Sequence, residues 1–230
     1  MARLSIRALL AFYDGAVSAD RAHSNAINAM LGEELGLGLL LAHLRATTGG
    51  EVAALDDPCT QGTSKGARLD RWVRVVRQGE AILYQVEIKN WCAHSLGGRP
   101  LAIDVDGEVV RAHAVATWKR YWDDTERRPA DEPLQKVLVP MQAPLRFRTD
   151  PIEPVACVWD LLSPTGTLEP WFSVPASGAM KALHWFSMSA YLRSLLVRGQ
   201  SEIELAMPTL EARLALIGRM VLGGRDGDRP

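Results

Sequence analysis

The chain has 230 residues, of which 47% are hydrophobic and 23% are charged. These are the proportions of an ordinary globular protein that can bury a core without disulfide or metal staples, so they argue against global disorder. The formal net charge of −1 does not by itself indicate a nucleic-acid-binding protein. Arginine accounts for 21 of the 26 cationic residues. Arginine suits phosphate contacts, but a GC-rich genome would produce the same bias.

Cysteine usage and hydropathy indicate a cellular setting. The three cysteines lie far apart and form no C-x-x-C pair, which is typical of a reducing compartment. Residues 1–12 include two arginines and lack the apolar centre of a signal peptide. No apolar stretch approaches the roughly 18 residues needed to cross a bilayer. We therefore expect a cytoplasmic protein with no membrane partner.

In the first half of the chain, apolar spacing predicts a long helix over residues 24–46, ended by Gly49 and Gly50. A short strand at 51–55 and a polar loop follow. Two strand-like runs, 67–77 and 81–91, come next, with Gln78-Gly79-Glu80 between them.

The second half predicts a helix at about 108–124 and buried strands at 136–141 and 155–161. Two more helices are expected, at 180–197 and 208–222. This order predicts an α/β fold with a mixed central sheet flanked by helices. We expect a core over residues 1–175 and a helical C-terminal extension over 176–230 that packs on it.

The second strand-like run carries the most informative residues. Strand alternation places Gln85, Glu87 and Lys89 on one face, with Val86 and Ile88 on the other. A carboxylate beside a cation at the end of a strand suits a metal-binding site. The E-x-K pattern is short, so its neighbours have to support it.

The strand before it supplies that support. If Gln78-Gly79 forms a two-residue turn, Arg77 pairs with Glu80, because glycine at the second position suits the primed turns. That register sets Asp70 opposite Glu87, with Cβ atoms roughly 5 Å apart. Two carboxylates so close repel unless a cation lies between them. A three-residue loop would instead turn Asp70 to the other face and break the site.

Leu69-Asp70 followed by Val86-Glu87-Ile88-Lys89 resembles the signature of the PD-(D/E)xK phosphodiesterase superfamily, over about residues 24–161. The resemblance implies a restriction-endonuclease-like fold. It also implies a helical glutamate before the strands, for which Glu34 is the candidate because it shares a side with the apolar residues of its helix. Glu33 is the rival. Leu69 replaces the proline of the signature, and no Q-x-x-x-Y pattern follows Lys89, so the RecB-like branch is not assigned.

The resemblance further implies a Mg²⁺-dependent nuclease, with Mn²⁺ able to substitute, acting on DNA rather than RNA. Asp70, Glu87, Glu34 and the Ile88 carbonyl would hold the metal, and Lys89 would orient the attacking water or stabilise negative charge. One metal or two is left open. A nuclease-like binding or assembly module and a fortuitous match remain alternatives, and a homodimer is possible.

Other kinds of active site find less support in the sequence. There is no G-x-S-x-G elbow for a serine hydrolase and no G-x-x-x-x-G-K loop for a nucleotide. His23, His43, His113 and His184 show no pairing along the chain, so we expect structural roles for them.

Overall fold

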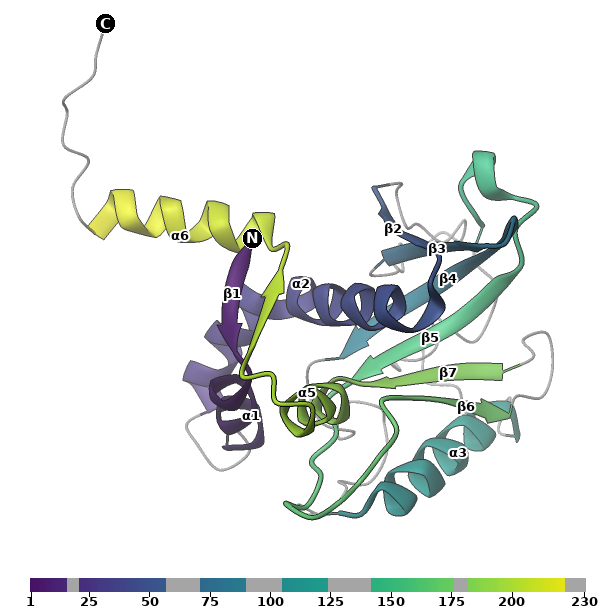
Figure 1. Ribbon diagram of the computed structural model, residues 1–230, viewed down its shortest axis with the longest axis horizontal. Helices are drawn as coiled ribbons and strands as arrows, with labels where there is room; N and C mark the ends of the chain where they lie inside the picture. Colours follow the sequence, from purple (N-terminus) through teal and green to yellow (C-terminus); the bar gives the residue numbers. More distant parts are fainter. Residues whose placement is uncertain (16–20, 57–70, 90–104, 124–141, 176–181, 222–230) are drawn as a thin grey trace, which may run out of the picture.

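The computed structural model describes six stretches of the chain: residues 1–15, 21–56, 71–89, 105–123, 142–175 and 182–221. Its centre is a mixed six-stranded sheet with the order β2-β3-β4-β5-β7-β6 (Figure 1). The strands are β2 (Glu51–Leu55), β3 (Arg71–Arg77), β4 (Glu80–Lys89), β5 (Ile152–Val158), β6 (Trp171–Pro175) and β7 (Ala182–Ser187). The strands β2, β3 and β4 form an antiparallel meander, β5 and β7 run parallel to β4, and β6 closes one edge antiparallel to β7.

Helices cover both faces of this sheet. One face, which we name the α2 face, packs against α1 (Ile6–Gly15), α2 (Arg21–Thr48) and α5 (Met188–Val197). The other, the α3 face, packs against α3 (Gly107–Asp123). Leu35, Leu39 and Leu40 of α2 are fully buried, each contributing about 2 kcal/mol through removal of apolar area from water. The prediction of an α/β fold with a mixed, helix-flanked sheet is confirmed.

Strand alternation explains how one sheet builds two cores. On β4, Tyr84, Val86 and Ile88 belong to the core under the α2 face, whereas Leu83 belongs to the core under the α3 face. On β7, Phe186 and Trp185 divide between the faces in the same way. Both faces of the central strands are therefore buried, as expected where helices cover a sheet on both sides.

The predicted helical extension over 176–230 is corrected by the structure. Residues 182–187, expected within a helix, form β7, which lies inside the central sheet between β5 and β6. The helix α5 begins only at Met188, where the Ser187 side chain accepts a hydrogen bond from the backbone of Ala190. A strand buried on both faces has a continuous apolar run, which periodicity alone does not distinguish from a buried helix.

Two further elements join the ends of the described chain. Strand β1 (Ala2–Ser5) pairs antiparallel with β8 (Glu202–Leu205), which follows α5. The helix α6 (Pro208–Val221) then projects from the body (Figure 1). A Cβ at Gly38 of α2 would lie 3.3 Å from the Leu205 side chain, so a glycine there allows helix and strand to approach closely. The predicted strand at 136–141 lies outside the described residues.

No helix in the described stretches is long and apolar enough to cross a lipid bilayer.

Candidate active site

A two-residue turn joins β3 to β4 and fixes their register. Gln78 and Gly79 have φ angles of 52° and 85°, the positive values that a primed turn requires. Arg77 pairs with Glu80, and the pairing continues to Arg71 opposite Val86. The predicted two-residue hairpin is confirmed, and the three-residue alternative is excluded.

The E-x-K residues lie on the α3 face, near the carboxyl end of β4. Glu87 pairs with Ala156 and Lys89 with Val158, two residues of the core under that face. Gln85 pairs with Trp72, which belongs to the same core. The predicted sharing of one strand face by Gln85, Glu87 and Lys89 therefore agrees with the register.

Glu87 and Lys89 form an ion pair at the boundary between core and solvent. The Lys89 Nζ atom lies 2.6 Å from Glu87 Oε1. The Glu87 side chain is fully buried, while that of Lys89 is 21% exposed. Removing a carboxylate from water costs on the order of several kcal/mol unless a cation or hydrogen bonds offset that cost. The Lys89 ammonium supplies this offset and also connects the buried carboxylate to the surface.

Two other predicted metal ligands, Asp70 and Ile88, are not placed by their side chains beside Glu87 in the described structure. Asp70 lies outside the described residues, and the last described pair of the hairpin is Arg71 with Val86. Ile88 is described, and its side chain packs under the α2 face. The predicted ligand role of Ile88 therefore concerns its backbone carbonyl and not its side chain.

Glu34 is not brought to Glu87. The segment of α2 that carries it follows a break at Gly32, where φ is 32° and ψ is −131°, and packs on the α2 face of the sheet. The Glu34 carboxylate accepts hydrogen bonds from the backbone N–H groups of Thr209 and Leu210, each at 2.8 Å. These are first-turn donors of α6, which have no partner within their own helix. The structure thus replaces the predicted ligand role of Glu34 with helix capping, and its rival Glu33 is exposed.

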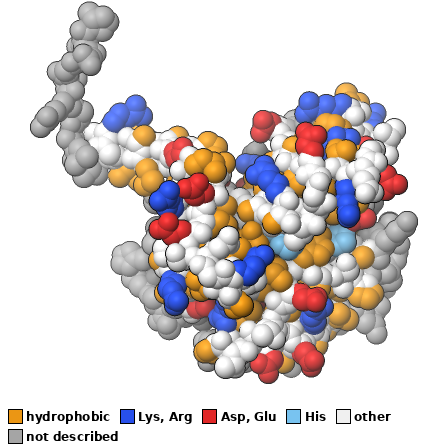
Figure 2. Space-filling model, viewed as in Figure 1, with side chains coloured by type: hydrophobic (Ala, Val, Ile, Leu, Met, Phe, Trp, Pro, Cys, Tyr) orange, Lys and Arg blue, Asp and Glu red, His pale blue; other side chains and the backbone are white. Residues whose placement is uncertain are grey.

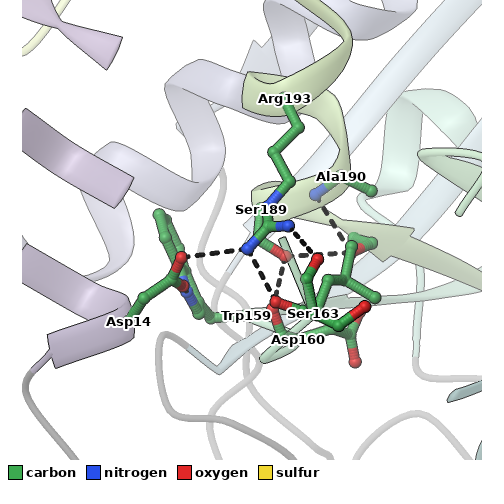
Figure 3. A network of polar contacts seen from close by, with 9 residues as sticks. Asp14, Trp159, Asp160, Ser163, Ser189, Ala190 and Arg193 are labelled. Carbon is green, nitrogen blue, oxygen red and sulfur yellow. Dashed lines mark hydrogen bonds and ion pairs between the residues drawn. The ribbon is translucent and has the colours of Figure 1, made fainter. Parts of the chain in front are cut away.

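The edge of the sheet beside Lys89 holds a buried polar network (Figure 3). The backbone N–H of Trp159 donates to the Lys89 carbonyl at 3.3 Å, so the chain after β5 lies against the end of β4. The next residue, Asp160, is fully buried, and its Oδ2 atom accepts a hydrogen bond from Trp185 Nε1 at 3.2 Å. Burial raises the pKa of Asp160 to about 6, against the opposing effect of hydrogen bonds from Ser187 and Trp185.

Arg193 of α5 holds this network in place. Its guanidinium donates to the carbonyls of Leu162 and Ser163 and pairs with Asp14 at the end of α1, at 3.2 Å (Figure 3). Asp14 also accepts from Trp159 Nε1 at 3.0 Å. Hydrogen bonds therefore hold the loop after β5 against the helices α1 and α5, at the end of β4 that carries Lys89.

A metal site is not complete within the part of the chain that the structure describes. No group of three or more histidine, cysteine, aspartate or glutamate side chains is placed there to hold an ion. Glu87 provides carboxylate oxygens of the kind that Mg²⁺ prefers. A complete set would require ligands beyond the described residues.

No protein-family model, no curated protein and no solved structure matches this chain. The resemblance to the PD-(D/E)xK superfamily therefore rests on the residues quoted above.

Sequence reasoning missed two polar groups. One of them is Asp160, whose recognisable signal is an aspartate that follows Trp159 just beyond the apolar strand β5. The other is His184, for which only a structural role was expected; its ring lies between Ser173 and Glu153, with contacts of 3.1 Å and 2.6 Å. Both partners of His184 lie on other strands, so residue spacing along the chain does not predict these contacts.

Proposed function

We propose that this chain is a Mg²⁺-dependent nuclease of restriction-endonuclease-like fold that hydrolyses phosphodiester bonds in DNA. The observation that carries the proposal is the fully buried Glu87 carboxylate, 2.6 Å from Lys89 at the carboxyl end of β4. Ligand sites in open α/β sheets are commonly found beyond the carboxyl ends of the strands. A buried carboxylate there is costly, and such a cost is often retained for function.

The hairpin register supports a second carboxylate at the same place. The described pairing ends one residue before Asp70, at Arg71 opposite Val86. If this pairing continued by one residue, Asp70 would lie opposite Glu87, with Cβ atoms about 5 Å apart. Positions 72 and 74 face α3 in the described strand, and position 70 shares their parity. We propose that Asp70 and Glu87 form the acidic pair of the site.

The donor set fits a hard divalent cation. Asp70, Glu87 and the Ile88 carbonyl would hold Mg²⁺, and Mn²⁺ would substitute; Glu34 is left out because it binds α6. When bound, the ion would neutralise charge on the phosphate and make a nearby water more acidic.

The chain's own residues have distinct roles in this scheme. Lys89 provides a positive charge for the negative charge that grows on the phosphate in the transition state. Glu87 holds Lys89 in position in the resting protein, because their ion pair is shielded from water on the carboxylate side. Gln85, buried two residues before Glu87 on the same face, would support its orientation.

The preference for DNA over RNA comes from the family resemblance alone, so the test uses both. Plasmid DNA, single-stranded DNA and single-stranded RNA are incubated with the protein in Mg²⁺, in Mn²⁺ and in EDTA. We expect metal-dependent cutting that Lys89→Ala lowers by about 100-fold or more, the usual effect of removing a group that stabilises transition-state charge. Arg77→Ala, which removes an exposed cation from the neighbouring strand, should leave cutting unchanged.

Lys89→Ala leaves the buried Glu87 carboxylate without its Lys89 partner, which destabilises the fold. A double variant that removes both charges is therefore tested alongside it. Glu87→Gln with Lys89→Met removes both charges at similar volume and should fold, as followed by circular dichroism, while remaining inactive. Equal cutting by wild type and both variants would place the activity elsewhere. No cutting of any substrate by folded wild type would favour the alternative, a nuclease-like binding or assembly module.

Two wider predictions belong with this proposal. A cytoplasmic setting is favoured by cysteines without a paired spacing, of which Cys157 is buried. A homodimer would suit cutting of both strands of a duplex. The exposed apolar side chains of α6 are a surface on which a second copy could pack: Leu214, Leu216, Ile217 and Met220.

A further inference from the structure

Three polar side chains form a connected row across the strands β6, β7 and β5. The Ser173 hydroxyl lies 3.1 Å from His184 Nδ1, and His184 Nε2 lies 2.6 Å from Glu153 Oε2. A carboxylate only accepts hydrogen bonds, so Nε2 carries the proton in this contact. In the neutral ring Nδ1 is then bare and accepts the hydrogen bond from the Ser173 hydroxyl.

This arrangement matches the geometric requirement for an activated nucleophile. A nucleophile and a base within about 2.6–3.2 Å of one another, with the base oriented by a third group, is the recurrent pattern of nucleophilic catalysis. The Ser173 side chain is exposed, whereas the His184 and Glu153 side chains are 15% and 38% exposed. The nucleophile is thus open to solvent, and the base behind it is partly shielded.

The strand register also provides a backbone donor beside the hydroxyl. Ser187 N donates to the carbonyl of Pro170, its partner in the antiparallel pair of β6 and β7. Bonded and non-bonded pairs alternate, so Ser173 and His184 form a non-hydrogen-bonded pair, in which side chains lie closest. The N–H of Ser173 then points away from β7, toward the edge where no described strand pairs with β6.

Aromatic rings surround the base. The Trp171 ring stacks on His184 with a centroid distance of 5.0 Å and an interplanar angle of 24°. Tyr84 meets the same imidazole edge-on at 5.7 Å. The face of the molecule in Figure 2 shows histidine side chains at the surface among hydrophobic ones. Trp171 is partly exposed and lies two residues before Ser173 on the same strand face, so it presents apolar surface near the serine.

The row lies on the α2 face, away from Glu87 and Lys89. Phe186 lies two residues after His184 on β7 and so shares its face, and Tyr84 contacts the His184 ring. Both belong to the core under the α2 face, whereas Glu87 pairs with a residue of the other core. The two sites are therefore separate and can be tested independently.

We propose that Ser173, His184 and Glu153 form a nucleophilic site that takes acyl groups from small aryl esters. The Ser173 Oγ atom attacks the carbonyl carbon, and its proton passes to His184 Nδ1. The ester C–O bond breaks, and the aryl oxygen leaves with that proton as a phenol. The Ser173 N–H donates to the carbonyl oxygen as it gains negative charge. Glu153 stabilises the imidazolium, and a water then releases the carboxylic acid and restores the serine.

The experiment measures acetylation by p-nitrophenyl acetate, through p-nitrophenol release and peptide mapping by mass spectrometry. Wild type should carry acetyl on Ser173, and Ser173→Ala should lose that modification. His184→Phe, which keeps an aromatic ring against Trp171, should slow phenol release by about 100-fold, the scale of a lost general base. Glu153→Gln should slow it by a smaller factor, and Ser173→Cys should restore acylation.

Ser201→Ala serves as the matched control, because Ser201 is an exposed serine outside the row. It should react as wild type does. Acetyl found on lysines or other serines but not on Ser173 would overturn the proposal. An equal rate of Ser173 acetylation in wild type and His184→Phe would overturn it as well.

Discussion

Burial makes the ionisation of the Asp160 carboxyl group costly. Its side chain is fully buried, and its Oδ1 atom has no hydrogen-bond partner among the described residues. Burial raises its pKa from 3.8 to about 6, so the folded protein binds the Asp160 proton more tightly than the unfolded chain does. The stabilising contribution of this group is fully present below about pH 4 and is lost as the pH rises through about 6.

Asp160→Asn should remove that pH dependence. An amide keeps an acceptor for Trp185 Nε1 and carries no charge, so the variant should gain stability relative to wild type at pH 8 and lose the gain at pH 4. The expected difference between the two pH values is roughly 1–3 kcal/mol, from the conversion of pKa shifts into free energy. Urea denaturation of both proteins across this pH range measures it. A stability difference that is the same at every pH would contradict the assignment.

At the scale of single residues, sequence reasoning succeeded where the relevant contacts are local. Strand alternation was enough to place Gln85, Glu87 and Lys89 on one face, because the side-chain direction alternates along any strand. The partners of His184 depend on the pairing of three strands that are distant in sequence. The run over 182–187 was expected in a helix, so the lateral contacts of His184 could not be found.

At the scale of elements, the turn residues were the most reliable signal. Gln78-Gly79 specifies a primed turn through its need for positive φ, and this turn fixes seven paired positions of β3 and β4. The role of Glu34 shows the opposite case. Its position on the apolar side of a helix indicated that it points inward, but the partner that binds it is a helix of 14 residues near the other end of the chain.

Glu34→Gln should loosen α6. The carboxylate satisfies two backbone donors and places negative charge at the helix N-terminus, where the helix dipole favours it. Replacing it by a neutral amide should cost about 1–2 kcal/mol and speed hydrogen exchange at Thr209 and Leu210. The neighbouring Glu33→Gln removes an exposed glutamate of the same helix and is the control. An equal loss in both variants would show that the cap is unimportant.

At the scale of the whole molecule, one sheet carries two polar sites on opposite faces. The Glu87–Lys89 pair lies on the α3 face at the carboxyl end of β4, and the Ser173–His184–Glu153 row lies on the α2 face. Composition and element order were sufficient to predict a mixed sheet between helices. They were insufficient for the strand order, because β7 takes its place in the sheet by pairing with both β5 and β6. Nothing local specifies that pairing.

We propose that Glu87 belongs to a divalent-metal site, and direct metal binding tests this assignment without knowledge of the substrate. Free Mn²⁺ is titrated with the protein and followed by electron paramagnetic resonance, for wild type, Glu87→Gln and Glu34→Gln. We predict that wild type and Glu34→Gln reduce the signal of free Mn²⁺ to the same extent, because Glu34 is bound to α6. Glu87→Gln should leave the signal of free Mn²⁺ unchanged. Equal Mn²⁺ binding by wild type and Glu87→Gln, or no binding by either, would contradict the claim.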